Sequence, residues 1–141
     1  MRHRDKTPIL KREPDQRRAL IRNLATSLIL HEGIETTKAK ALAFQPFVER
    51  IITLAKNPTL SNRRQIEIMT DTKGAARKAV EIYGVRFKDT KGGYTKVLKT
   101  RHRKGDNALM IYISFVKPKS EKGEKTEKRG SSNSKFRTQN S

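Results

Sequence analysis

The chain has 141 residues, of which 33 are Lys or Arg and 14 are Asp or Glu, so its formal net charge is +19. It has no cysteine, which excludes disulfides, and no apolar run approaches the roughly 20 residues that a membrane-spanning helix needs. So large a charge opposes compaction unless a polyanion neutralises it, which favours a nucleic-acid partner over the alternative of an anionic membrane surface.

The first half of the chain predicts a basic arm, two helices and a short strand. Residues 1–13 show no apolar period and are expected to form an extended basic arm. Segment 13–33 is typical of an amphipathic helix, because apolar residues recur at i, i+4 spacing and Gly33 is a common terminator. Residues 34–37 predict a strand. Residues 38–56 predict a second amphipathic helix, in which Pro46 is expected to cause a kink or a break near 43–45.

The second half predicts two short helices followed by a hairpin. Segment 61–70 indicates a weaker third helix, and "GAARKAVEIYG" (74–84) a fourth, with Gly84 expected as its C-terminal cap. Residues 94–100 predict a strand, and "RKGDN" (103–107) predicts a connection. Residues 108–116 give the clearest strand of the chain. Its apolar residues alternate onto one face: Leu109, Ile111, Ile113 and Phe115.

These elements predict an α+β fold with a single domain over 14–116. Only 33% of the residues are hydrophobic, which is low for a globular domain and implies a small core. We therefore expect two layers, with one face of a small three-stranded sheet packed on about four helices. Residues 117–141 contain one aromatic and no aliphatic residue. They cannot bury enough surface to offset their ordering entropy, so we expect a disordered basic tail.

Catalytic and metal chemistry find little support in the sequence. The three histidines, His3, His31 and His102, do not form a pair at i, i+3 or i+4 spacing. The segment "HEGIE" (31–35) begins like an H-E-x-x-H zinc motif, but its fifth residue is Glu35 where the motif requires a second histidine. The acidic residues are scattered along the chain, and we interpret them as residues of solvated faces and helix caps. We expect no enzyme, no cofactor, no metal site and no small-molecule substrate; a nuclease or RNA-modifying enzyme would need a carboxylate cluster or cofactor loop.

The cations are grouped in a way that predicts phosphate binding. Segment 86–104 holds eight Lys or Arg and one acid, and both ends of the chain are also basic. The absence of heptads, zinc-finger spacing and an aromatic RNA-binding strand favours recognition of backbone and shape over base reading. Tyr94 is the one aromatic in the basic strand. It is interpreted as a core residue, with stacking on a base as the alternative.

Four blocks carry a resemblance to a known family: "MRHR" at 1–4, "RRALIRNLATSLILHEGIETTKAKA" at 17–41, "ITLAK" at 52–56 and "GGYTKVLKTRHRKGDNALMIYISFV" at 92–116. In order and spacing they resemble the L17 family of bacterial large-subunit ribosomal proteins, over about residues 1–116. The resemblance implies a two-layer α/β fold with a mixed sheet. It also implies a non-catalytic, cytoplasmic rRNA-binding role in the large subunit, beside neighbouring ribosomal proteins near the polypeptide exit region.

The resemblance also implies rRNA-binding residues. Those that match the family's arm, first helix, strand-to-helix corner and hairpin are Arg2, His3, Arg4, Arg17, Arg22, Asn23, Thr36, Thr37, Lys40, Tyr94, Lys96, Lys99 and Arg103. The basic blocks add Lys6, Lys11, Arg12, Arg18, Lys38, Lys91, Arg101, His102 and Lys104 as phosphate contacts. The function expected is a structural constituent of the large subunit that stabilises folded rRNA. The alternative is a free, nucleoid-type nucleic-acid-binding protein.

Overall fold

The computed structural model describes residues 8–116, so the predicted tail 117–141 and the first half of the predicted arm lie outside the described residues. Chain order is α1 (Pro14–His31), β1 (Gly33–Thr37), α2 (Lys38–Ala55), α3 (Leu60–Met69), α4 (Lys73–Lys78), a π-helical turn (Ala79–Tyr83), α5 (Gly84–Arg86), β2 (Thr95–His102) and β3 (Leu109–Phe115). Since α4, the π-helical turn and α5 run on without interruption, the expected count of about four helices is confirmed.

The sheet has the strand order β1-β3-β2, and both pairs are antiparallel. The mixed sheet implied by the family resemblance is therefore wrong. β2 and β3 are joined by a short turn, which imposes an antiparallel pair. β1 lies along the other edge of β3, with Gly33 beside Ser114 and Thr37 beside Met110. This register places the start of α2 at the same end of the sheet as the β2–β3 turn.

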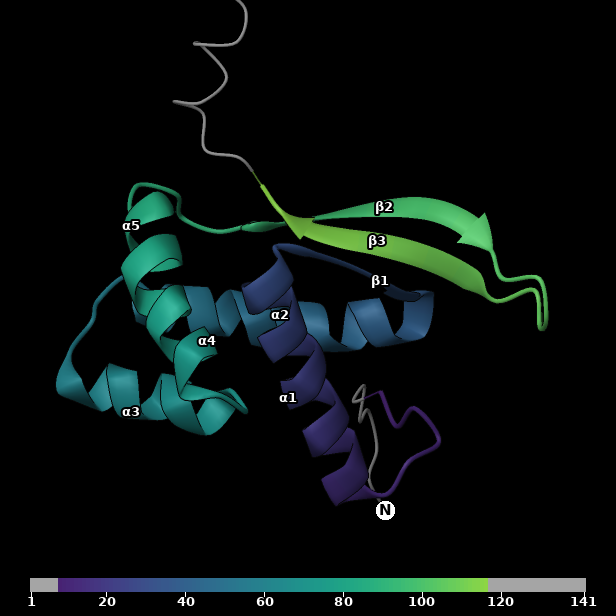
Figure 1. Cartoon of the computed structure of the whole chain (residues 1–141), viewed down its shortest axis with the longest axis horizontal. Helices are drawn as coiled ribbons and strands as arrows, with labels where there is room; N and C mark the ends of the chain where they lie inside the picture. Colours follow the sequence, from purple (N-terminus) through teal and green to yellow (C-terminus); the bar gives the residue numbers. More distant parts are fainter. Residues whose placement is uncertain (1–7, 117–141) are drawn as a thin grey trace, which may run out of the picture.

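Helices α1 and α2 lie against one face of the sheet, and α3, α4 and α5 pack beside them (Figure 1). The expected two-layer α+β architecture is confirmed. The alternation in β3 buries Ile111, Ile113 and Phe115 in the core, and the helices contribute residues spaced at three and four positions. The largest fully buried helical side chains are Leu28, Ile29, Phe44, Val48, Ile51, Ile52, Ile66 and Tyr83.

The predicted break of α2 at Pro46 and the predicted helix cap at Gly84 are wrong. α2 continues through Pro46 without a break. Pro46 is exposed, as is Leu42 one turn earlier, so the carbonyl that loses its helical partner lies on the solvent side, where water can satisfy it. Gly84 does not cap the fourth helix, because its φ of −58° is helical. Its lack of a side chain instead lets α5 approach Ala55 of α2.

The described part of the predicted arm is a turn and not an extended segment. Leu10 and Lys11 both have positive φ, 55° and 51°, and the Arg12 N–H donates to the Ile9 carbonyl at 3.2 Å. Two successive left-handed residues reverse the chain. The turn brings Lys11 and Arg12 next to the first residue of α1, Pro14.

Candidate nucleic-acid interface

The structure distributes the predicted site residues over three places. Arg2, His3, Arg4 and Lys6 lie outside the described residues. The N-terminal half of α1 and the turn before it carry Lys11, Arg12, Arg17, Arg18, Arg22 and Asn23. The end of the sheet at the β2–β3 turn carries Thr36, Thr37, Lys38, Lys40, Lys99, Arg101, His102, Arg103 and Lys104. Lys91, Tyr94 and Lys96 lie at the opposite end of β2. The α1 end and the hairpin turn project separately from the body (Figure 1).

The β2–β3 turn is held by its own polar contacts. The Arg103 Nε donates to Asp106 Oδ1 at 2.8 Å, and a second guanidinium nitrogen pairs with the other carboxylate oxygen. The Ala108 N–H also donates to Asp106, at 3.3 Å. These bonds favour the charged carboxylate and lower the pKa of Asp106 from 3.8 to about 2. Arg103 is therefore engaged within the turn, and the turn presents a fixed backbone.

A second internal pair crosses the outer face of the sheet. Arg101 on β2 donates to both carboxylate oxygens of Glu35 on β1, at 3.2 and 3.4 Å, and the Thr100 hydroxyl donates to Glu35 at 2.9 Å. The guanidinium, followed by the hydroxyl, lowers the pKa of Glu35. Because the two strands are separated by β3, this bridge ties the two edges of the sheet together.

The lysines at this end of the sheet have no such partner. Lys38, Lys40, Lys99 and Lys104 form no ion pair with any residue in 8–116. Lys38 and Lys40 occupy the first turn of α2, which holds no acid, and the preceding Thr37 gives no side-chain cap. A helix N-terminus carries partial positive charge and free N–H groups. Two lysines there add positive charge to the positive end of the helix. This is electrostatically unfavourable without a partner and suits the binding of a phosphate.

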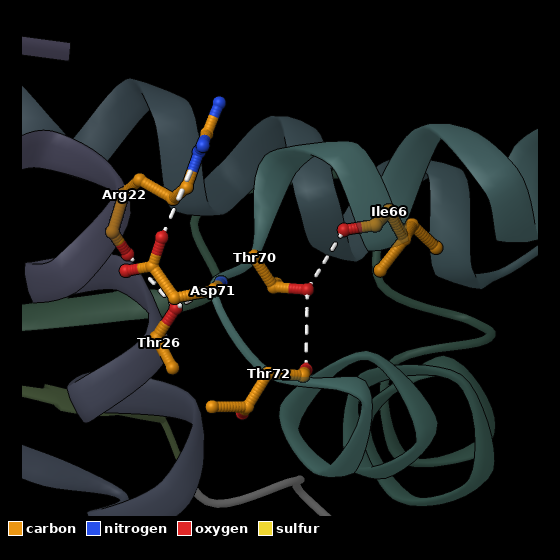
Figure 2. Close-up of polar contacts among 6 residues, drawn as sticks. All are labelled: Arg22, Thr26, Ile66, Thr70, Asp71 and Thr72. Atoms are coloured by element: carbon orange, nitrogen blue, oxygen red, sulfur yellow. Dashed lines mark hydrogen bonds and ion pairs between the residues drawn. The ribbon is translucent and has the colours of Figure 1, made fainter. Parts of the chain in front are cut away.

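At the other group, two of the α1 arginines have acidic partners. Arg18 pairs with Asp15 at 3.2 Å in the first turns of the helix. The Arg22 Nε lies 3.8 Å from Asp71 of the α3–α4 link, while the buried Thr26 hydroxyl accepts from the Asp71 N–H at 3.0 Å (Figure 2). Arg22 thus helps to hold the link against α1. Lys11, Arg12 and Arg17 have no ion-pair partner among the described residues.

Two predicted contact residues are not on the surface. Tyr94 is 1% exposed and its ring centroid lies 5.2 Å from that of Phe87. The interpretation as a core residue is confirmed, and stacking of a base on this ring is wrong, because Phe87 and the strand cover it. The Lys56 ammonium lies 5.7 Å from the Tyr94 centroid. Thr36 is also buried, on the inner face of β1.

The sequence reasoning missed the cations that organise the end of α1. Lys78 and Arg86 both approach Glu32, at 3.6 and 4.0 Å, and the Lys78 Nζ donates to the Leu30 carbonyl at 2.7 Å. Burial, followed by the charge of Glu32, raises the pKa of the Tyr83 hydroxyl nearby. No sequence signal links these residues, since Glu32 and Arg86 are far apart in the chain.

A surface groove of about 260 Å³ lies between α3 and α4. It is lined by Arg63, Glu67, Lys73, Ala76, Arg77, Val80 and Glu81. Its two acids offset most of the charge of its three cations, so it is a weaker anion site than the α2 end. In residues 8–116 no group of three or more His, Asp or Glu side chains is arranged to hold a metal ion. No helix of that segment is long and apolar enough to cross a membrane.

Comparison with known proteins agrees with this picture. The family described as ribosomal protein L17 matches residues 20–116. The chain belongs to the ribosomal protein L17 family. It is similar to the large ribosomal subunit protein bL17 of Gemmatimonas aurantiaca, at 48% identity over 82% of this chain and 98% of that protein. The bL17 proteins of a Hydrogenobaculum species and of Rickettsia typhi are 46% and 42% identical, again over 82% of this chain, and over 99% and 85% of their own lengths.

The family expected from the sequence is therefore confirmed. With it, the expectation of a ribosomal protein and not an enzyme is confirmed. The family match covers α1 from Leu20 to the end of β3, and so includes both the α2 end and the hairpin.

Proposed function

We propose that the chain is a structural constituent of the bacterial large ribosomal subunit in the cytoplasm, where it binds and stabilises folded rRNA and supports subunit assembly and translation. The family membership and the names of its relatives support this proposal. The observation that carries the rRNA contact is the start of α2. Its two lysines lie at the same end of the sheet as the basic β2–β3 turn, without acidic partners among the described residues.

In this proposal the fold holds basic side chains in fixed positions. The buried residues of β3 fix the hairpin, and the Arg103–Asp106 pair fixes its turn. Lys99 and Lys104 then project from a rigid support towards the phosphates of one RNA segment. Lys38 and the free N–H groups of α2 provide a further contact at the same end. Such contacts position the protein on RNA by shape and backbone and release counterions on binding.

The remaining predicted contacts and partners form part of the same proposal. The α1 end, with Lys11, Arg12 and Arg17, contacts a second RNA segment. Neighbouring ribosomal proteins near the polypeptide exit region are the proposed protein partners. Two exposed apolar side chains, Ile82 of the π-helical turn at 47% and Val85 of α5 at 72%, are of the kind that protein interfaces cover. We propose no cofactor, small-molecule substrate or membrane contact.

Sedimentation tests the assignment. The chain, carrying an affinity tag, is followed through a sucrose gradient of a lysate of its own bacterium at moderate salt. We expect it in the large-subunit fraction. Recovery only in free fractions or with DNA would contradict the proposal and favour the nucleoid-type alternative.

A matched pair of lysine substitutions tests the α2 end. Lys38 and Lys73 are both exposed and each is the first residue of a helix, α2 or α4. In both, replacement by Glu puts an acid at the positive end of the helix, which favours the fold by about 0.3–1 kcal/mol. We expect Lys38→Glu to weaken binding to a large-subunit rRNA fragment and to reduce the log–log salt slope by about 1. Lys73→Glu should leave both unchanged. Equal effects of the two substitutions would show that only net charge matters and would refute the α2 site.

A further inference from the structure

The sheet has a second face that no described helix covers. Inward residues such as Ile34, Val97 and Ile113 meet the helices. The alternate positions point to the other side, where Tyr112 lies between Glu35 of β1 and Leu98 of β2. In Figure 1, α1 and α2 lie below the sheet, and α3, α4 and α5 lie to its left, beyond the ends of the strands. Among residues 8–116, the outer face is therefore open.

The Tyr112 side chain packs over Gly33 on this face. A β-carbon added at Gly33 would fall 2.0 Å from the Tyr112 hydroxyl oxygen and 2.6 Å from the ring carbon that carries it. The phenol end of the ring thus occupies the space that a side chain at position 33 would fill. Tyr112 is 38% exposed and the adjacent Leu98 is 44% exposed. The Tyr112 hydroxyl forms no hydrogen bond with the described residues. No polar contact within 8–116 therefore fixes the position of the ring.

The charges around Tyr112 fit a nucleotide. Glu35 is the neighbouring acid, and its two oxygens are already bonded by Arg101 and Thr100. Lys96 lies on the same face one row along, opposite Ser114, exposed and without an ion-pair partner among the described residues. An aromatic ring and an exposed cation on the same face of a sheet suit a base and its phosphate.

We propose that Tyr112, supported by Gly33 and Leu98, is a stacking platform for one unpaired RNA nucleotide, whose phosphate is bound by Lys96. The proposal rests on the proposed rRNA-binding function and deepens it, since it assigns a single-stranded contact to a protein otherwise argued to bind backbone. A protein partner is the less suitable occupant. The apolar area consists of two exposed side chains on a basic strand, which is small for a protein interface.

Substitution of Tyr112 tests the platform. Affinity is measured by fluorescence anisotropy for an unstructured RNA of about 12 nucleotides and for a duplex of the same length. Base stacking on an aromatic side chain contributes about 1–3 kcal/mol, so Tyr112→Ala should weaken single-strand binding by about 5- to 150-fold. Tyr112→Phe keeps the ring and should bind as the wild type does. Duplex binding should not change in either variant.

Two further variants keep the test informative if Tyr112→Ala unfolds. Gly33→Ala displaces the phenol from its position over residue 33 and, like Tyr112→Ala, should weaken single-strand binding. Because the chain has no tryptophan, Tyr112→Trp gives a single fluorescent reporter. Its emission should be quenched by the single-stranded RNA and not by the duplex, whereas equal or absent quenching would overturn the platform.

The outcomes separate this inference from the proposed function. Wild-type chain that binds RNA and sediments with the large subunit, with Tyr112→Ala unchanged in single-strand affinity, would overturn the platform alone. Wild-type chain that binds neither RNA nor the subunit would overturn the proposed function. A folded Tyr112→Ala variant that keeps its RNA affinity and loses associated ribosomal proteins would assign the face to a protein and overturn the inference.

Discussion

Gly84 offers a sharp test of the packing between the fourth helix and α2. A β-carbon added at this position would lie 2.4 Å from the carbonyl oxygen of Ala55 and 3.0 Å from its carbonyl carbon. The obstacle is backbone in the last turn of α2, so no side-chain rotation relieves it. Gly84 itself has helical φ and ψ of −58° and −43°, and an alanine would meet no conformational penalty there.

The size of the effect follows from two opposing terms. In an unobstructed helix, replacement of glycine by alanine stabilises by about 0.5–1 kcal/mol. Here the contact must open by about 1 Å, and overpacking of this kind costs about 1–3 kcal/mol. We expect Gly84→Ala to destabilise the fold by about 1–2 kcal/mol, which lowers the melting temperature by about 5–15 °C for a domain of this size. Gly74, in α4, has open space around its β position, so Gly74→Ala should stabilise by about 0.5–1 kcal/mol.

Thermal unfolding followed by far-UV circular dichroism measures both variants against the wild type. A third variant, Gly84→Asn, separates packing from capping. A glycine that caps a helix is replaced more easily by asparagine than by alanine, whereas close contact with Ala55 makes the larger asparagine worse. The reasoning is refuted if Gly84→Ala is as stable as Gly74→Ala, or if Gly84→Asn is the milder of the two substitutions at position 84.

Two further predictions concern polar contacts. Thr26→Val should destabilise by about 1–3 kcal/mol, because it leaves the Asp71 N–H without its buried acceptor; Thr53→Val, which removes only an exposed bond to its own helix, should change stability little, and equal urea midpoints would contradict this. Asp106 should titrate near pH 2 by NMR. Since its folded pKa is depressed, its stabilising effect is present above the ordinary value of 3.8 and is lost as pH falls towards 2. Arg103→Ala should raise the midpoint towards 3.8, and an unchanged midpoint would refute the pairing.

The general fold was predictable because its signals are periodic and local. The alternation in 108–116 identifies the buried face of β3, and the i, i+4 pattern in 13–33 identifies the buried side of α1. The same alternation already implied that Tyr112 points away from the core. The chemistry of the basic strand nevertheless drew attention to Tyr94, which precedes β2 and is buried by Phe87.

The errors in the helices arise from the surroundings of each residue in the fold, which the local sequence pattern does not give. A glycine that closes a helical pattern is a common cap signal, but Gly84 is required by Ala55, a residue of another helix. A proline inside a helical pattern commonly breaks the helix, but Pro46 lies on an exposed face. Gly33 likewise does not carry the left-handed turn after α1, since Glu32 has the φ of 64°. Gly33 makes room for Tyr112 instead.

The number of cations in the sequence does not by itself show how many of them are available to bind RNA. Within the described residues, the predicted contacts that have acidic partners are all arginines: Arg18, Arg22, Arg101 and Arg103. The lysines of the set that lie within 8–116 have none, in keeping with the planar, forked guanidinium being the better partner for a carboxylate. At the hairpin, the arginines therefore hold the shape, and in the proposed function the lysines provide the charge that binds phosphate. Lys99→Ala should consequently reduce the salt dependence of RNA binding with little effect on the turn, whereas Arg103→Ala should first alter the turn itself.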